Sequence, residues 1–287
     1  MLRPLLPKYR PVASQSYERL IDILDHCDAL ILDGFGVINV GNQKIEAIDE
    51  LLDKCARDGK IVVVLTNGAS HPSVNTAQKY QAWGLAISAE QIVSSRDAFI
   101  AAMMQKSSRP IISLCGASTP IGWQSEIRFE EDDQSWAGAD GAVLLGTTSW
   151  NEDAHSRLER FLRIGKRTLY IANPDISAPH MDGFSHEPGY WAARLIQAGL
   201  TTPHWFGKPH APAFKLAIAR INQIAGRTIQ PDRIVMVGDS PHTDILGGNA
   251  AGLRTALITS YGLLREHHAE QLVADINIMP DFMVRRI

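Results

Sequence analysis

The sequence predicts an α/β fold with a parallel sheet, on three observations. Short apolar runs bounded by Gly, Asn or Asp recur along the 287 residues, without the alternation of a half-exposed strand. The segments between them carry apolar residues at helical spacing. Polar residues that could do chemistry follow several of the runs directly. Alternating strands and helices are typical of a sheet that is covered by helices on both faces.

The elements follow from these patterns in chain order. Strands are predicted at residues 29–32, 61–65, 111–114, 142–145, 168–171, 234–237 and 255–258. Helices are predicted between them, among others at 45–58, 76–83 and 213–224. A further helix is expected at 14–24, leading into the first strand.

Composition and charge exclude several classes of protein. A content of 45% hydrophobic and 21% charged residues fits a soluble chain of one or two globular domains. The net charge of −3 gives no basic field, so a nucleic acid polymer is not an expected partner. Three widely separated cysteines suggest neither a disulfide framework nor a zinc site. Early prolines and the absence of a long apolar run exclude a signal peptide and a membrane span, so a cytoplasmic location is expected.

The first polar cluster, Asp33-Gly34-Phe35-Gly36, follows the apolar run at 29–32. A carboxylate at the carboxyl end of a buried parallel strand lies where open α/β sheets bind ligands. The two glycines allow the backbone to approach a ligand closely. Asp33 is therefore a candidate nucleophile.

Further polar residues follow the other predicted strands or precede a helix. They are Thr66, Asn67, Lys208, Asp239, Ser240 and Asp244. A hydroxyl, backbone amides and a lysine can stabilise anionic oxygens, and adjacent carboxylates call for a cation such as Mg²⁺. The set suits phosphoryl transfer in which Asp33 attacks phosphorus and forms an aspartyl-phosphate. Taken singly, each residue could instead end a strand or cap a helix.

The order of these motifs resembles that of the haloacid dehalogenase-like (HAD) hydrolase superfamily. Within it, the sequence resembles class IIA, the branch that contains nitrophenylphosphatase-type sugar and nucleotide phosphatases. The match is strongest over residues 206–252, where Gly207-Lys208-Pro209 and the segment from Gly238 to Gly248 correspond to the third and fourth motifs. Thr66-Asn67 corresponds to the second. The resemblance implies a Rossmann-like core, residues 1–107 and 203–287, with an inserted α/β cap of type C2 at 108–202.

The resemblance also implies roles for the residues at matching positions. Asp33 and Lys208 would be catalytic, and Gly34, Thr66, Asn67 and Lys208 would bind phosphate. Mg²⁺ would be held by Asp33, Asp239 and the backbone carbonyl of Phe35, with support from Asp244 and Ser240. In the cap, Asn173, Asp175, His180 and Asp182 would select the leaving group, although their loop could equally be an ordinary connection. The expected substrate is a small phosphorylated metabolite, a sugar phosphate or a nucleotide, and the expected assembly is a homodimer formed through the cap.

Phe35 departs from the family's first motif, which carries a second Asp at this position. That Asp protonates the leaving alcohol and then activates water, and a phenyl ring does neither. Loss of a positioned general acid and base lowers the rate by about 10²- to 10⁴-fold. We therefore expect an intact Mg²⁺ site with impaired turnover. His71, His210 and His242 follow the later motifs, and each could substitute as the acid and base or could be an ordinary loop residue.

Two other functions remain open. A phosphometabolite-binding protein would keep the pocket without turnover. A metal-independent dehalogenase, in which Asp attacks carbon, also carries an aromatic residue two positions after the nucleophile. Against the dehalogenase, its helical cap comes soon after the nucleophile, where this chain has no room for it, and Asp239 with Asp244 favours a metal site.

Overall fold

The computed structural model describes residues 5–104, 110–114, 120–122, 125–180, 183–265 and 269–287. The chain forms two compact units. The seven-strand unit contains residues 6–66, 73–93 and 208–287, and the five-strand unit contains residue 5 with residues 67–72 and 94–207. In the part of the chain that the model describes, no helix combines the length and the apolar character that a membrane crossing requires.

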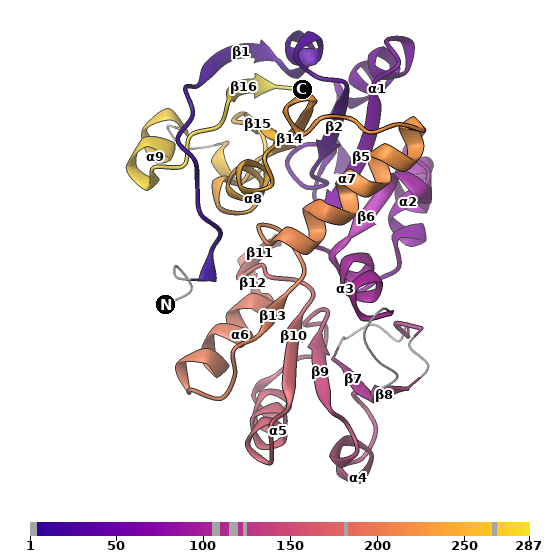
Figure 1. The fold of residues 1–287 in the computed structure, drawn as a ribbon, viewed down its shortest axis with the longest axis vertical. Helices are drawn as coiled ribbons and strands as arrows, with labels where there is room; N and C mark the ends of the chain where they lie inside the picture. Colours follow the sequence, from indigo (N-terminus) through magenta and orange to yellow (C-terminus); the bar gives the residue numbers. More distant parts are fainter. Residues whose placement is uncertain (1–4, 105–109, 115–119, 123–124, 181–182, 266–268) are drawn as a thin grey trace. The chain divides into compact units, whose positions relative to one another are not determined.

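The seven-strand unit is built on a sheet with the order β1-β16-β15-β14-β2-β5-β6 (Figure 1). Its strands are β1 (Gln15–Arg19), β2 (Ala29–Leu32), β5 (Ile61–Thr66), β6 (Ile92–Ser94), β14 (Ile234–Gly238), β15 (Arg254–Ile258) and β16 (Phe282–Arg286). Adjacent strands from β1 to β5 run parallel. A hairpin of β3 (Asn39–Val40) and β4 (Gln43–Lys44) follows β2.

Helices cover both faces of this sheet, which explains why its strands do not alternate between apolar and polar residues. They are α1 (Ile48–Arg57), α2 (Ser73–Ala82), α7 (Ala211–Ala225), α8 (Leu246–Ala250) and α9 (Ala269–Ile276), with short turns η2 (Leu20–His26), η3 (Ala89–Gln91), η4 (Pro231–Arg233), η5 (Pro241–Ile245) and η6 (Gly262–Leu264). Leu30 and Leu32 pack with α1 and α2 in one hydrophobic cluster. Ala29 and Ile31 pack with α7 in another, on the opposite face. Successive residues of β2 thus enter two different cores.

The five-strand unit has its own parallel sheet, with the order β13-β10-β9-β7-β8. Its strands are β7 (Ile111–Leu114), β8 (Glu126–Arg128), β9 (Gly141–Leu144), β10 (Thr168–Ile171) and β13 (His204–Trp205), and β11 (Ser177–His180) pairs antiparallel with β12 (Gly183–His186). Its helices are α3 (Ser95–Met104), α4 (Asp133–Ala137), α5 (Glu152–Arg163) and α6 (Pro188–Gln197). Trp136, Leu158 and Trp191, from α4, α5 and α6, meet the sheet in one hydrophobic core.

The predicted α/β class and the strands predicted from apolar runs are confirmed, with ends that shift by at most one residue. The helix expected at 14–24 is wrong. Residues 15–19 form β1, and the turn η2 follows it. Gln15 lies opposite Phe282 and Tyr17 opposite Val284, so a pairing with the far end of the chain replaces the local helix. The cap boundaries at 108 and 202, and the homodimer, stay predictions.

Candidate active site

Asp33 is the first residue after β2, at the carboxyl end of the sheet. Its backbone N–H donates to the carbonyl of Val237 (2.9 Å), which continues the pairing of β2 with β14. Its carboxylate Oδ1 accepts a hydrogen bond from the N–H of Gly34 (2.7 Å). The side chain is 14% exposed. The sheet therefore fixes the backbone of Asp33, and the turn that follows fixes its carboxylate.

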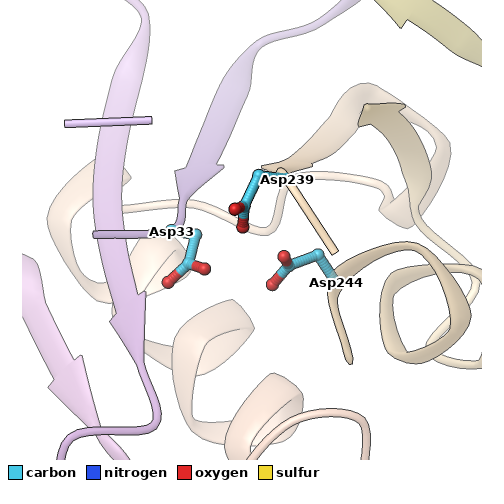
Figure 2. Close-up of side chains that lie close together, drawn as sticks. All are labelled: Asp33, Asp239 and Asp244. Atoms are coloured by element: carbon cyan, nitrogen blue, oxygen red, sulfur yellow. The ribbon is translucent and has the colours of Figure 1, made fainter. Parts of the chain in front are cut away.

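Two more carboxylates lie beside Asp33. Asp239 directly follows the neighbouring strand β14, and Asp244 belongs to η5, a single π-helical turn. One oxygen from each of the three side chains lies within 4.8 Å of the others. Figure 2 shows the three carboxylates close together. All three belong to the seven-strand unit. Because β2 and β14 are parallel neighbours, residues about 200 positions apart in the chain reach the same edge of the sheet.

Lys208 supplies the positive charge within this cluster. Its Nζ lies 2.7 Å from Asp33 Oδ1 and 2.7 Å from Asp244 Oδ1, and its side chain is only 2% exposed. Burial opposes the charged form of lysine, but the two carboxylates outweigh burial, and the pKa of Lys208 is raised. Lys208 therefore stays protonated at neutral pH.

One lysine does not neutralise three buried carboxylates. Burial, with further repulsion from Asp244, raises the pKa of Asp239 from 3.8 to about 7. Burial also raises the pKa of Asp33 well above its usual value; Lys208 opposes this rise, whereas Asp244 and Asp239 add to it. Like charges held this close disfavour one another's ionised form. A divalent cation bound between Asp33 and Asp239 would relieve that repulsion.

Three glycines make room for these carboxylates. A Cβ atom on Gly36 or on Gly262 would overlap the side chain of Asp239, and one on Gly238 would overlap Asp244. Gly36 and Gly262 also have φ angles of +76° and +69°, which L side chains rarely adopt. The glycines of the first and fourth motifs are thus required by the carboxylates beside them.

Two contributors to the cluster carry no motif signal. The N–H of Leu263, in η6, donates to Asp239 Oδ2 (2.7 Å) and holds that carboxylate from a segment far along the chain. Tyr80, buried on α2, places its hydroxyl 2.9 Å from where a Cβ on Gly34 would lie. Burial, and then the charge of Asp33, raises the pKa of Tyr80, so its hydroxyl stays neutral.

The remaining motif residues of the seven-strand unit lie on elements next to the cluster. Thr66 ends β5, the parallel neighbour of β2. The N–H of Ser240 donates to Asp244 Oδ2 (3.1 Å), so Ser240 orients that carboxylate. Phe35 is half-buried and forms a bridge with Asn39, in a turn where the N–H of Gly36 donates to the carbonyl of Asn39 (2.8 Å). The metal-binding role of the Phe35 carbonyl stays a prediction.

The other predicted site residues belong to the five-strand unit. Asn67, Asn173 and Asp175 lie in one hydrogen-bonded network there. His180 ends β11, and the prediction for Asp182 lies outside the described residues. The role of all four cap residues in choosing the leaving group stays a prediction.

The three histidines considered as substitutes for the missing acid differ in their environment. His71 and His242 are exposed. His210 precedes α7, and burial lowers its pKa to about 4, so its imidazole is neutral at pH 7. A neutral imidazole with so low a pKa is a poor proton donor to a leaving group.

Two family models match the two regions of the sequence that carry the motifs. A family model described as haloacid dehalogenase-like hydrolase matches residues 30–121. A second model, described as HAD-hydrolase-like, matches residues 205–287. These two regions contain Asp33, Thr66, Lys208, Asp239 and Asp244.

Individual proteins resemble the chain over most of its length. A dihydroxyacetone phosphatase of Corynebacterium glutamicum is 24% identical over 80% of this chain and 80% of its own. Phosphoglycolate phosphatase 1A of Arabidopsis thaliana is 26% identical over 97% of this chain and 80% of its own. Among solved structures, one described as a possible sugar phosphatase of the HAD superfamily from Cytophaga hutchinsonii has a TM-score of 0.84 and 25% identity, and the match covers 95% of this chain and 97% of that one.

Proposed function

This chain belongs to the haloacid dehalogenase-like hydrolases, among proteins of the class IIA phosphatase type, and we propose that it is a Mg²⁺-dependent phosphatase of a small phosphorylated metabolite. The observation that carries the proposal is the convergence of Asp33, Asp239, Asp244 and Lys208 at the carboxyl end of the sheet. Aspartyl-phosphate chemistry needs a nucleophilic carboxylate, a metal site and a fixed positive charge. The cluster offers all three within one unit.

The donor set fits Mg²⁺. This ion takes oxygen ligands and is commonly held by one or two carboxylates, with water and substrate phosphate as its other ligands. Asp33 and Asp239 are the proposed protein ligands; burial, and then the neighbouring carboxylates, raises the pKa of both, and a cation bound to them would favour their ionised forms. When bound, the ion would neutralise part of the charge on the phosphate oxygens.

Asp33, Lys208, Thr66 and Gly34 would then each have a separate role in the reaction. Asp33 Oδ attacks phosphorus, a P–O bond to Asp33 forms, and the bond to the leaving alcohol breaks. Lys208, fixed by Asp33 and Asp244, stabilises the charge on the phosphate oxygens. Water then attacks phosphorus, releases inorganic phosphate and restores Asp33. Thr66 and Gly34 are proposed to donate hydrogen bonds to the phosphate.

The substrate class that we propose is a phosphate monoester of a small hydroxylated compound. The names of the similar proteins support this, because dihydroxyacetone and glycolate are compounds of three and two carbon atoms. Phe35 supports a further feature, namely that turnover depends on the leaving group. Without a general acid at this position, an alcohol that leaves easily as its anion is released faster than a basic alcohol.

The test is release of phosphate from 4-nitrophenyl phosphate and from a panel of sugar phosphates, small hydroxy-acid phosphates and nucleotides, with and without Mg²⁺. The matched control is Asp33→Asn, which keeps the shape of the side chain and removes the nucleophile. We expect Mg²⁺-dependent release that this variant abolishes. Release that persists in Asp33→Asn would contradict the mechanism. Mg²⁺-dependent phosphate binding without any release would instead identify a binding protein.

A further inference from the structure

The side chain of Asn67 is hydrogen-bonded at both ends of its amide. Its Nδ2 donates to Asp175 Oδ1 (2.8 Å), and its Oδ1 accepts from the hydroxyl of Ser95 (3.1 Å). All three residues belong to the five-strand unit, and Asn67 and Ser95 are buried. A carboxylate accepts hydrogen bonds and donates none when ionised. Asp175 therefore decides which face of the Asn67 amide carries nitrogen and which carries oxygen.

The loop that carries Asp175 is itself held by a chain of hydrogen bonds. The N–H of Asp175 donates to Asn173 Oδ1 (3.0 Å), and Asn173 Nδ2 donates to Glu187 Oε2 (3.2 Å). The hydroxyl of Ser185, on β12, donates to the other oxygen of Glu187 (2.6 Å). The carbonyl of Asp175 accepts from the N–H of Gly189 (2.8 Å). Such a network restrains the loop that carries Asp175.

Close packing around two glycines also fixes the contact between Asn67 and Asp175. A Cβ on Gly207 would overlap Pro174 and would come within 2.6 Å of Asn67 Oδ1 and of the Ser95 hydroxyl. A Cβ on Gly189 would overlap the carbonyl of Pro174. Residues 174–175 thus pack against Gly189 and Gly207, and Gly207 is part of the Gly207-Lys208-Pro209 motif.

We propose that Asp175 is a positioning residue for Asn67, and that it acts on the phosphate-binding turn rather than on the leaving group of the substrate. Asn67 is the residue after Thr66, the last residue of β5, so holding its amide also sets the turn that begins there. This inference rests on the proposed function, since the turn matters only where a phosphate binds. It assigns Asp175 a role different from the selection of the leaving group expected from the sequence.

A double-mutant cycle tests the proposal. Asn67→Ala, Asp175→Ala and the double variant are compared for kcat and KM on 4-nitrophenyl phosphate and on two alkyl phosphates of different size, and for inhibition by inorganic phosphate. Asp175→Asn is the conservative variant, because its amide oxygen can still accept from Asn67. Asp153→Ala, which removes an exposed carboxylate of the same unit, is the matched control.

Asp175→Ala should lower kcat/KM by about 10- to 100-fold, as expected for loss of a hydrogen bond to a charged group. The loss should be equal across the substrates, and inhibition by phosphate should weaken by a similar factor. The double variant should match Asn67→Ala to within about threefold, because residues in one network are not additive. Asp175→Asn should recover most of the activity, and Asp153→Ala should keep it.

Losses that multiply in the double variant would show that Asp175 acts independently of Asn67, and losses that differ between substrates would show that it acts on the leaving group; either result would overturn the proposal. An equal loss in Asp175→Asn and Asp175→Ala would overturn it as well. Both outcomes require a wild-type protein that hydrolyses phosphate esters. If the wild type neither hydrolyses them nor binds inorganic phosphate, the proposed function itself fails and this inference fails with it.

Discussion

The hydroxyl oxygen of Tyr80 lies 2.9 Å from the position that a Cβ atom on Gly34 would occupy. Gly34 follows the candidate nucleophile. Tyr80, on α2, belongs to the hydrophobic cluster that also contains Leu30 and Leu32 of β2. A side chain at residue 34 would therefore displace the Tyr80 hydroxyl. The two positions should respond to substitution as a pair.

Gly34→Ala should destabilise the protein and lower its activity, because the added methyl group meets the Tyr80 hydroxyl. Inserting a carbon into a packed site typically costs about 1–3 kcal/mol. Tyr80→Phe removes the hydroxyl, so the double variant should regain much of what Gly34→Ala loses. Urea unfolding and hydrolysis of 4-nitrophenyl phosphate measure both effects. Gly165→Ala, at a glycine with open surroundings, is the control. Equal losses in Gly34→Ala and in the double variant would show that this contact is not the cause.

Lys208→Met should both destabilise the protein and abolish hydrolysis. The variant leaves Asp33 and Asp244 buried and facing each other without the ammonium group between them. Removing one partner of a buried ion pair costs about 3–5 kcal/mol. Lys215→Met, on the exposed side of α7, should change little. If Asp244→Asn in the Lys208→Met background recovers no stability, charge repulsion is not the cause of the loss.

The contribution of Asp239 to the stability of the metal-free protein should fall as pH rises from about 4 to above 7, whereas that of His210, whose pKa burial lowers from 6.5 to about 4, should rise over the lower part of this range. The folded state raises the pKa of Asp239 from 3.8 to about 7, so the folded chain binds a proton that the unfolded chain has lost in this range. That contribution is present at low pH and disappears as the carboxyl ionises. Mg²⁺ binds the ionised form, so its stabilising effect should grow over the same range.

Thermal unfolding with Mg²⁺ and with a chelator, between pH 5 and pH 8, checks this expectation. Asp239→Asn should flatten the pH dependence of the metal-free protein and weaken the response to Mg²⁺. A stability difference between the metal-free wild type and Asp239→Asn that does not decrease from pH 5 to pH 8 would contradict the argument.

Phe35→Asp should raise the hydrolysis of alkyl phosphates more than that of 4-nitrophenyl phosphate. The new carboxyl can donate a proton to a basic leaving alcohol, whereas 4-nitrophenolate leaves without help. A positioned general acid contributes about 10²- to 10⁴-fold. The ratio of the two rates is the measurement, with Phe35→Leu as the control that removes the ring without adding a carboxyl. An unchanged ratio in Phe35→Asp would show that proton transfer at this position does not limit turnover.

Local sequence patterns predicted the interior strands of the two larger sheets except β16, because each of these buried strands is a short apolar run whose signal is complete within a few residues. The motif residues could be chosen for the same reason, since Asp33 and Asp239 directly follow a strand, and Lys208 and Asp244 lie shortly before the helices α7 and α8. Their family resemblance adds their roles. The helix expected at 14–24 failed where the decisive partner, β16, lies at the opposite end of the chain.

The sequence by itself determined the α/β class, the buried strands that form apolar runs and the identity of the charged residues. Only the tertiary structure decided that Lys208 bridges Asp33 and Asp244, that Leu263 holds Asp239, and that Asn67 is oriented by Asp175. The physical reason is that strand formation depends on neighbours in the chain, whereas these contacts depend on sheet order and loop packing. Sheet order and loop packing bring together residues that lie far apart in the sequence, and no local pattern links such residues.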